Sequence, residues 1–427
     1  MPATHAPTSL IDSRYAAWRL LVTLTLVTLG NSGMYVVAVV LPAVQVEFGI
    51  GRADASFPYT LMMVALGLGG VWMGRIADRR GIAPVLGVGA AAIAAGYALA
   101  AQCHNIWTFG LVHGVLLGML GGAATFAPLI ADTALWWNKR RGFAVAICAC
   151  GNYLAGTVWP PLVQWGIEHW GWRTTYLAMG LVCGLGIGAL SLCMRLRAPH
   201  SAAPAASPGH DADPAPSADA SGSRPFGMSQ NSAQALLFLA GVACCVAMSM
   251  PQVHIVAYCV DLGFGAGRGA EMLSLMLACG IASRLIFGAI SDRVGGLRTL
   301  LLGSALQGVA LLMFLPVQGL VPLYVVSALF GLFQGGIVPA YAIIVREHFP
   351  AQQVGARVGW VTMATLVGMA LGGWMSGWVF DLTGSYLAAF VNGSAWNMLN
   401  LCIVGFLLYR VRQARIPSLP ASAASHH

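Results

Sequence analysis

Arg284 is the residue of this chain best placed to do chemistry, because it lies inside an apolar run, eight residues before Asp292. In a membrane-spanning helix, a rise of about 1.5 Å per residue would put it roughly 12 Å from the helix end, within a hydrocarbon core about 30 Å thick. Gly280 and Gly288, four residues to either side, would leave space around it on the same helix face.

The charge of Arg284 needs a partner, because an arginine at this depth costs about 3 kcal/mol or more on insertion scales. No acidic residue lies in the interior of any apolar run of the chain. Backbone carbonyls with water could compensate the charge. Alternatively, the protein could bind an anion through two donors of the planar guanidinium.

Polar side chains in five other apolar runs could complete a site around such an anion. Asn31 and Tyr35 are four residues apart, as are His254 and Tyr258, so each pair shares one face of a helix. Taken singly, each polar residue is better explained by helix packing. Taken as a set, they predict contacts to a substrate from Asn31, Tyr35, Tyr258, Gln334 and Tyr341, with Asn152 nearby. Imidazole titrates near physiological pH, so we predict proton coupling at His254, with His113 as the weaker candidate.

The composition shows which elements must position these residues. Charged residues make up 8% of the 427 residues and hydrophobic residues 58%, whereas a soluble domain has about 25% charged residues. Most of the surface must therefore face lipid. Since a spanning helix needs about 20 apolar residues, the sequence predicts twelve transmembrane helices, at approximately 17–41, 57–77, 83–103, 106–132, 142–164, 173–195, 233–259, 270–290, 298–315, 320–345, 355–380 and 385–410.

A short charged pattern occurs twice and divides these helices into two sets of six. Gly74-x-x-x-Asp78-Arg79-x-Gly81 returns as Gly288-x-x-x-Asp292-Arg293-x-Gly295, with an offset of 214 residues at every matched position. Each copy lies between two apolar runs and is typical of a short turn. A repeat of this length in a hydrophobic chain predicts a duplicated membrane unit.

The distribution of basic residues predicts the orientation. With both termini placed in the cytoplasm, eighteen of the 22 lysines and arginines fall on that side, three fall outside (Arg52, Arg173 and Arg268), and Arg284 falls within a span. This is the positive-inside bias, so the net charge of +8 reports topology and does not indicate nucleic-acid binding. We expect a multi-pass protein of the cell (inner) membrane.

A stretch rich in Ala, Pro, Ser and Asp separates the two sets of helices and is predicted to be a disordered cytoplasmic linker. The predicted organisation is a tail at 1–16, a six-helix bundle at 17–197, the linker at 198–231, a second six-helix bundle at 232–411 and a tail at 412–427. The ten cysteines have no metal-binding spacing and lie in or beside apolar runs. We therefore predict no metal and no cofactor.

The repeated turn resembles the signature loop of the major facilitator superfamily, and the resemblance extends over nearly the whole chain. It implies an all-α membrane fold of twelve transmembrane helices in two six-helix bundles, a functional monomer, and a cavity lined by spans 1, 4, 7 and 10. It also implies a conformational gate at Gly74, Asp78, Arg79, Gly81, Gly288, Asp292 and Arg293. A carboxylate at a tight turn can bond helix N-terminal amides and hold two half-domains together, although plain topology charge also explains the arginines. Gly81 is followed by Ile82-Ala83-Pro84, not by basic residues, which weakens the first gate.

A second motif points to one branch of that superfamily. Trp136-Trp137-Asn138-Lys139-Arg140-Arg141-Gly142-Phe143-Ala144 resembles the motif before span 5 of monocarboxylate transporters, and Pro251-Gln252-Val253-His254 resembles span 7 of bacterial members. Arg284 matches the substrate-binding arginine of that group and of the related oxalate/formate exchangers. Gly280, however, stands where proton-linked members carry an aspartate. The lysine of span 1 and the second cation of span 11 have no counterpart either. A single fixed charge favours a monoanion and leaves the coupling ion open.

The sequence therefore predicts a secondary transporter that moves a small monocarboxylate by alternating access, with a proton as coupling ion and the lipid bilayer as its surroundings. One alternative is a transporter of another solute, such as an effluxed amphipathic drug, in which Arg284 is structural. A membrane-embedded enzyme is the second alternative, but the chain has no HExxH motif and no paired intramembrane carboxylates. A channel or sensor would leave the two matched turns unexplained.

Overall fold

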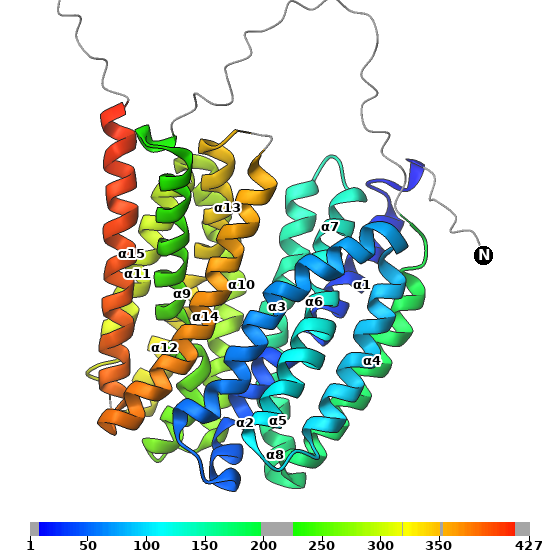
Figure 1. Ribbon diagram of the computed structural model, residues 1–427, viewed down its shortest axis with the longest axis vertical. Helices are drawn as coiled ribbons and strands as arrows, with labels where there is room; N and C mark the ends of the chain where they lie inside the picture. The colour runs from blue at the N-terminus through cyan, green and yellow to red at the C-terminus, as the bar shows by residue number, and fades with distance from the viewer. Residues whose placement is uncertain (1–7, 198–224, 318, 351–352, 415–427) are drawn as a thin grey trace, which may run out of the picture.

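The computed structural model describes residues 8–197, 225–317, 319–350 and 353–414, which are helical throughout their length apart from short turns and contain no β-strand (Figure 1). Eleven helical segments in these ranges are long and apolar enough to cross a membrane. One of them, Arg141–Cys193, turns at Gly171, whose φ of 76° is unfavourable for residues other than glycine. This segment provides two crossings, so the twelve predicted transmembrane helices are confirmed.

The first half of the chain contains crossings one to six. They are formed by α1 (Arg14–Gly30) with α2 (Ser32–Phe48), α3 (Arg52–Arg80), α4 (Ile82–Ala100), the series α5 (Ile106–Val112), η2 (His113–Gly122), α6 (Ala123–Thr125) and α7 (Ala127–Leu135), and the two arms of α8 (Arg141–Cys193). A short 3-10 turn, η1 (Thr8–Leu10), precedes them. The segment η2 is a π-helix, a form that often occurs near functional sites.

The second half contains crossings seven to twelve. They are formed by α9 (Gln230–Asp261), α10 (Ala266–Val294), α11 (Gly296–Met313), α12 (Leu320–Gln334) with α13 (Ile337–His348), α14 (Val354–Thr383) and α15 (Tyr386–Ala414). The short turn η3 (Pro225–Gly227) precedes α9. Residues 198–224 of the predicted linker, and residues 1–7 and 415–427 of the predicted tails, lie outside the described residues.

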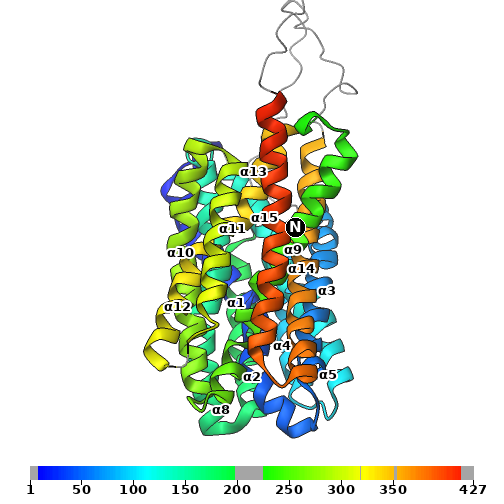
Figure 2. The same cartoon turned by 90° about the vertical axis from the view of Figure 1, so that its left-hand side faces the viewer.

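The two repeated turns have the same geometry. Gly81 (φ 87°) ends α3 and Gly295 (φ 84°) ends α10, and the amide of each bonds to the carbonyl four residues earlier. Both φ values favour glycine, which explains why the repeat preserves this residue. We call the end of the bundle that carries these turns the turn end, and the opposite end, where α3 begins, the Arg52 end. The chain enters α1 and leaves α15 at the turn end (Figures 1 and 2).

The two halves meet mainly where α3 packs against α14 and α8 packs against α10. Thr60 on α3 donates to the carbonyl of Ala370 (3.1 Å), and Ser274 on α10 donates to the carbonyl of Thr157 (2.5 Å). The Thr157 carbonyl has no helical donor because residue 161 is proline, which lacks an N–H.

The halves diverge toward the turn end (Figure 1). On the turn side of Arg284, no hydrogen bond or ion pair joins the halves among the residues described. The structure is therefore closed at the Arg52 end and open at the turn end.

Candidate functional site

Arg284 lies on α10 at the junction of the two halves, with no carboxylate beside it in the described part of the chain. Its Nη1 donates to the carbonyl of Ala149 on α8 (3.0 Å), and its Nε lies 3.5 Å from the carbonyl of Gly335. The guanidinium carbon lies 4.5 Å from the centre of the Tyr153 ring. Arg284 is half-buried, and its Nη2 makes no hydrogen bond with a described protein atom. One planar donor group therefore contacts both halves and retains donor capacity.

A break in crossing ten supplies one of these contacts. The carbonyl of Gly335 would normally accept from the amide of residue 339, but that residue is proline. The helix is interrupted between α12 and α13, and Ser283 accepts the Gly335 amide through its hydroxyl (3.0 Å). The proline thus leaves the Gly335 carbonyl available to the Arg284 side chain.

Two glycines let aromatic rings pack closely around Arg284. A Cβ on Gly280 would lie 2.6 Å from the Tyr153 ring, and a Cβ on Gly156 would lie 2.8 Å from the Tyr35 ring. Such separations are shorter than van der Waals contact. The Tyr153 ring therefore occupies the space that a side chain at position 280 would need, which gives a physical reason for glycine at the position where aspartate is expected.

Of the predicted substrate contacts, Tyr35 is the residue that lies beside this group. Its hydroxyl lies 3.3 Å from Oδ1 of Asn152, the residue before Tyr153. The four others lie elsewhere. Asn31 bonds back to the carbonyl of Val27 between α1 and α2, and Gln334 accepts from Gln252. Tyr341 donates to Asn400 within the second half, and Tyr258 packs against Tyr386 and Phe390 near the Arg52 end.

The two predicted proton-coupling histidines are both fully buried, in different surroundings. His113 lies inside the first half, where Nδ1 contacts the Phe109 carbonyl (2.8 Å) and Nε2 contacts the Tyr176 hydroxyl (3.2 Å). His254 lies where the halves meet. Its Nε2 contacts the Gly373 carbonyl (2.8 Å), and its Nδ1 contacts the Tyr386 hydroxyl (3.2 Å).

The predicted gate residues do not form a gate in this structure. Asp78, Arg79, Asp292 and Arg293 are exposed and make no hydrogen bond or ion pair in the described ranges. A Cβ built on Gly74 or Gly288 meets no atom within 4 Å, so both positions face open space. At the second turn the amide of Gly296, which begins α11, is capped by the Glu347 carboxylate (3.1 Å to each oxygen). Glu347 lies outside the repeated pattern and was not predicted from the sequence.

Arg52 makes the contacts that were least expected from the sequence, where it only marks the outer side of the membrane. Its Nη2 pairs with Asp261 at 2.6 Å, and its Nη1 donates to the Tyr386 hydroxyl at 3.1 Å. The amides of Arg52 and Ala53 both donate to the Asp381 carboxylate at 2.8 Å. The available signal was that charged residues stand at the same ends of spans 2, 7 and 11.

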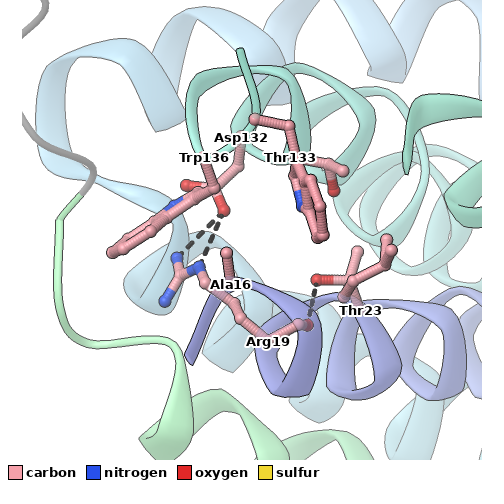
Figure 3. Close-up of a pocket in the computed structure, with 8 residues that line it drawn as sticks. Ala16, Arg19, Thr23, Asp132, Thr133 and Trp136 are labelled. Atoms are coloured by element: carbon pink, nitrogen blue, oxygen red, sulfur yellow. Dashed lines mark hydrogen bonds and ion pairs between the residues drawn. The ribbon is translucent and has the colours of Figure 1, made fainter. Parts of the chain in front are cut away.

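A second arginine buried in the bundle has its own counter-ion. Arg19 on α1 is 2% exposed, pairs with Asp132 on α7 at 2.9 Å, and lies over the Trp136 ring (Figure 3). Trp136 and Trp137 of the basic motif line this pocket, and the Asp12 carboxylate bonds to the amides of Asn138 and Lys139. The motif therefore anchors the start of the chain to the connection between α7 and α8. Arg284 differs from Arg19 in having no carboxylate partner within the described ranges.

The sequence matches the profile described as the Major Facilitator Superfamily over residues 21–321 and 272–426. Monocarboxylate transporter 13 of Rattus norvegicus is 28% identical over 323 residues, which are 75% of this chain and 72% of that protein. Monocarboxylate transporter 11 of Homo sapiens is 28% identical over 330 residues, or 74% of this chain and 66% of that protein. An uncharacterized MFS-type transporter, YcxA of Bacillus subtilis, is 24% identical over 80% of this chain and 82% of its own.

Solved structures show the same fold at lower sequence identity. A bacterial homolog of the human lysosomal transporter Spinster, in an inward-facing and occupied conformation, superposes with a TM-score of 0.68 at 14% identity. The match covers 94% of this chain and 97% of the other. The nucleoside transporter NupG superposes with a TM-score of 0.64 at 13% identity, over 92% and 98% of the two chains.

Proposed function

This chain belongs to the Major Facilitator Superfamily and is a multi-pass membrane transporter, and we propose that it moves a small monocarboxylate anion together with a proton by alternating access. Membership of that family identifies it as a transporter and not as an enzyme. The relatives named as monocarboxylate transporters support an anionic substrate, as does the motif around Trp136.

The observation that carries the proposal is the missing counter-ion of Arg284. Asp132 pairs with Arg19, whereas no carboxylate of the described residues pairs with Arg284, although Arg284 lies where the halves meet. A substrate carboxylate would accept from Nη2, which has no protein partner in the described part of the chain, and from Nε, whose contact to Gly335 is long at 3.5 Å. Two parallel charge-assisted hydrogen bonds of this kind are stronger than neutral ones. A single fixed cation suits a monoanion.

In the proposed orientation both termini and the turn end face the cytoplasm, in the cell (inner) membrane, with the monomer as the functional unit. The structure is then closed to the outside and open to the inside, ready to release substrate. The basic residues support this orientation, because they concentrate at the turn end. The exposed gate residues at Asp78 and Asp292 are proposed to pair when the turn end closes.

Proton coupling is assigned to His254. No carboxylate lies beside Arg284 among the described residues, and His254 is the histidine at the junction of the halves. His113 remains the weaker candidate, since it lies within the first half. Of the other predicted contacts, Tyr35 stays in the proposed substrate site, joined there by Asn152 and Tyr153.

Uptake of labelled carboxylates by proteoliposomes, with and without a pH gradient, tests the proposal. Arg284→Ala should abolish saturable uptake. Arg284→Lys should restore little of it, because an ammonium lacks the two-donor geometry. Arg268→Gln is the matched control, because Arg268 lies on the same helix but is exposed and pairs with Glu271; this variant should transport normally.

The alternative with a specific observation in its favour is a transporter of a neutral or amphipathic solute. The two carbonyls that contact Arg284 would then be its permanent partners. Normal transport by a well-folded Arg284→Ala variant would favour this alternative over the carboxylate.

A further inference from the structure

The contacts that Arg52 and Ala53 make with Asp261, Asp381 and Tyr386 cross from one half to the other. Arg52 and Ala53 begin α3 in the first half, whereas Asp261, Asp381 and Tyr386 belong to α9, α14 and α15 of the second. The Asp381 carboxylate accepts both amides at the start of α3, so the second half caps a helix of the first. Separation of the halves at this end would leave the cap, the ion pair and the Tyr386 hydrogen bond unmade.

Hydrogen-bond chemistry gives these contacts a direction. A guanidinium can only donate, so the Tyr386 oxygen accepts from Arg52, and the hydroxyl proton is free to point at Nδ1 of His254. The Gly373 carbonyl can only accept, so Nε2 of His254 must carry a proton. The chain of donors therefore runs from Arg52 through Tyr386 and His254 to Gly373. It requires neutral His254 with its single proton on Nε2.

A second proton on His254 would interrupt this chain. Nδ1–H would point at an oxygen that already accepts from Arg52, and the Tyr386 hydroxyl would have to turn away. The imidazolium would also be a second buried cation close to Arg52.

The surrounding carboxylates are already engaged, Asp261 by the guanidinium and Asp381 by the two amides. The other polar groups around His254 are neutral: Ser56 on α3, 3.5 Å away, and Tyr258 one turn along α9. No described anion is therefore free to pair with the imidazolium, and an unpaired buried charge is strongly unfavourable.

We propose that Arg52, Asp261, Asp381, Tyr386 and His254 form a latch that keeps the Arg52 end closed only while His254 is neutral. A proton that His254 takes from the solution at this end releases the latch and favours the state open at the Arg52 end. The proposal rests on the alternating access and proton coupling proposed above, and it does not depend on the substrate.

Spin labels carried by unnatural amino acids at positions 46 and 387 can test it in the full chain, in nanodiscs and without substrate. Val46 near the end of α2 is 84% exposed, and Leu387 near the start of α15 is 52% exposed, so the labels report across the halves at the Arg52 end. Electron–electron distances are measured between about pH 8 and about pH 5, where histidine titrates. We expect the parent to shift from short to long distances as the pH falls.

The variants separate the latch from a general effect of acid. In His254→Gln the amide can donate to Gly373 and accept from Tyr386, so this variant should stay at the short distance throughout. Tyr386→Phe removes the hydrogen-bond link between Arg52 and His254 but leaves the buried charge, so its latch should be weaker and its distances should lengthen at a higher pH than in the parent. Arg173→Gln is the control, because Arg173 is at the same end but pairs with Glu47 in its own half; it should respond as the parent does.

A parent distance that does not change with pH would overturn the proposal, as would a His254→Gln variant that shifts like the parent. Because no substrate carboxylate is added in this experiment, its result is independent of the uptake measurements on Arg284 variants.

Discussion

At the scale of single residues, two arginines within the bundle, Arg19 buried and Arg284 half-buried, have different surroundings. Arg19 has a carboxylate within its own half, whereas Arg284 has two backbone carbonyls, an aromatic ring and donor capacity to spare. Composition alone would treat both as costly charges in a membrane. Arg19 is paired with a carboxylate, and the donor capacity that Arg284 retains is what we propose an anion uses.

Asp132→Asn should destabilise the protein, because it leaves the Arg19 charge buried without its counter-ion. Breaking a buried pair by removing one partner costs about 3 kcal/mol. Thermal unfolding in detergent, followed by tryptophan fluorescence, measures the effect. Glu271→Gln, which removes one partner of an exposed ion pair, should change the unfolding temperature little. Equal losses in the two variants would argue against a special role for the buried pair.

Gly280→Ala should slow uptake, because the new Cβ would press on the Tyr153 ring below Arg284. Overpacking of this kind costs about 1 kcal/mol or more, which corresponds to a rate loss of at least about fivefold. Combined with Tyr153→Leu, the same substitution should cause no further loss, since the obstructing ring is gone. Gly405→Ala, where a Cβ meets nothing within 4 Å, is the control for added helix propensity. Additive losses in the double variant would mean that the two positions act separately.

At the scale of helices, the prolines of crossings five and ten matter more than the regular stretches around them. The break at Gly335 exposes the carbonyl that Arg284 contacts, and Pro161 does the same for the Thr157 carbonyl that Ser274 contacts. Proline in these positions therefore creates acceptors between the halves without any polar side chain.

Pro339→Ala should weaken transport. The amide restored at residue 339 can donate to the Gly335 carbonyl, as in a regular helix, and so competes with Arg284 for this acceptor. The loss of one hydrogen-bond acceptor is worth about 1 kcal/mol, or about fivefold in the initial rate of carboxylate uptake. Pro322→Ala is the matched control. It lies in the first turn of α12, where an amide has no helical acceptor. If the two proline variants transported equally well, the break would have no part in function.

The helices could be predicted from the sequence because the length and hydropathy of an apolar run are local properties. The two turns could be predicted as well, since the repeated pattern is visible in the amino-acid sequence. The site was predicted only in part. Tyr341 and Tyr35 look alike in the sequence, yet Tyr341 bonds to Asn400 inside its own half and Tyr35 lies beside Asn152 at the junction. The rotation of a helix, set by its breaks and its neighbours, decides that difference.

Arg52 shows a further reason for what was missed. Its position at the start of a span is explained fully by topology, and its partners lie 209, 329 and 334 residues away in sequence. Single-sequence reasoning has no means to pair residues at such separations. The predicted gate at Asp78 and Asp292 stays a prediction, because this structure is open at that end.

At the scale of the whole molecule, the two halves behave as bodies that meet at one end. The inter-half polar contacts of the described residues extend from the Arg52 end to Arg284 and no further. The orientation proposed for this arrangement can be tested directly.

A protease site inserted in the 198–231 linker should be cut in inside-out vesicles and protected in intact spheroplasts. A site inserted at Gly384, in the exposed turn between α14 and α15 at the Arg52 end, should give the reverse pattern. Cleavage of the linker site from outside would invert the proposed topology. It would then place the latch on the cytoplasmic side.

The hydroxyl groups that join the halves have a bearing on how fast the transporter can work. Thr60 contacts the carbonyl of Ala370 across the junction and also that of Ser56 on its own helix, at 3.1 and 3.3 Å. A serine or threonine in a helix can always fall back on the carbonyl one turn earlier, and Ser274 has the same option. When the halves rock apart, each hydroxyl exchanges one acceptor for another and is not left bare in hydrocarbon. The loss of these hydrogen bonds across the junction therefore adds little to the activation barrier of the transport cycle.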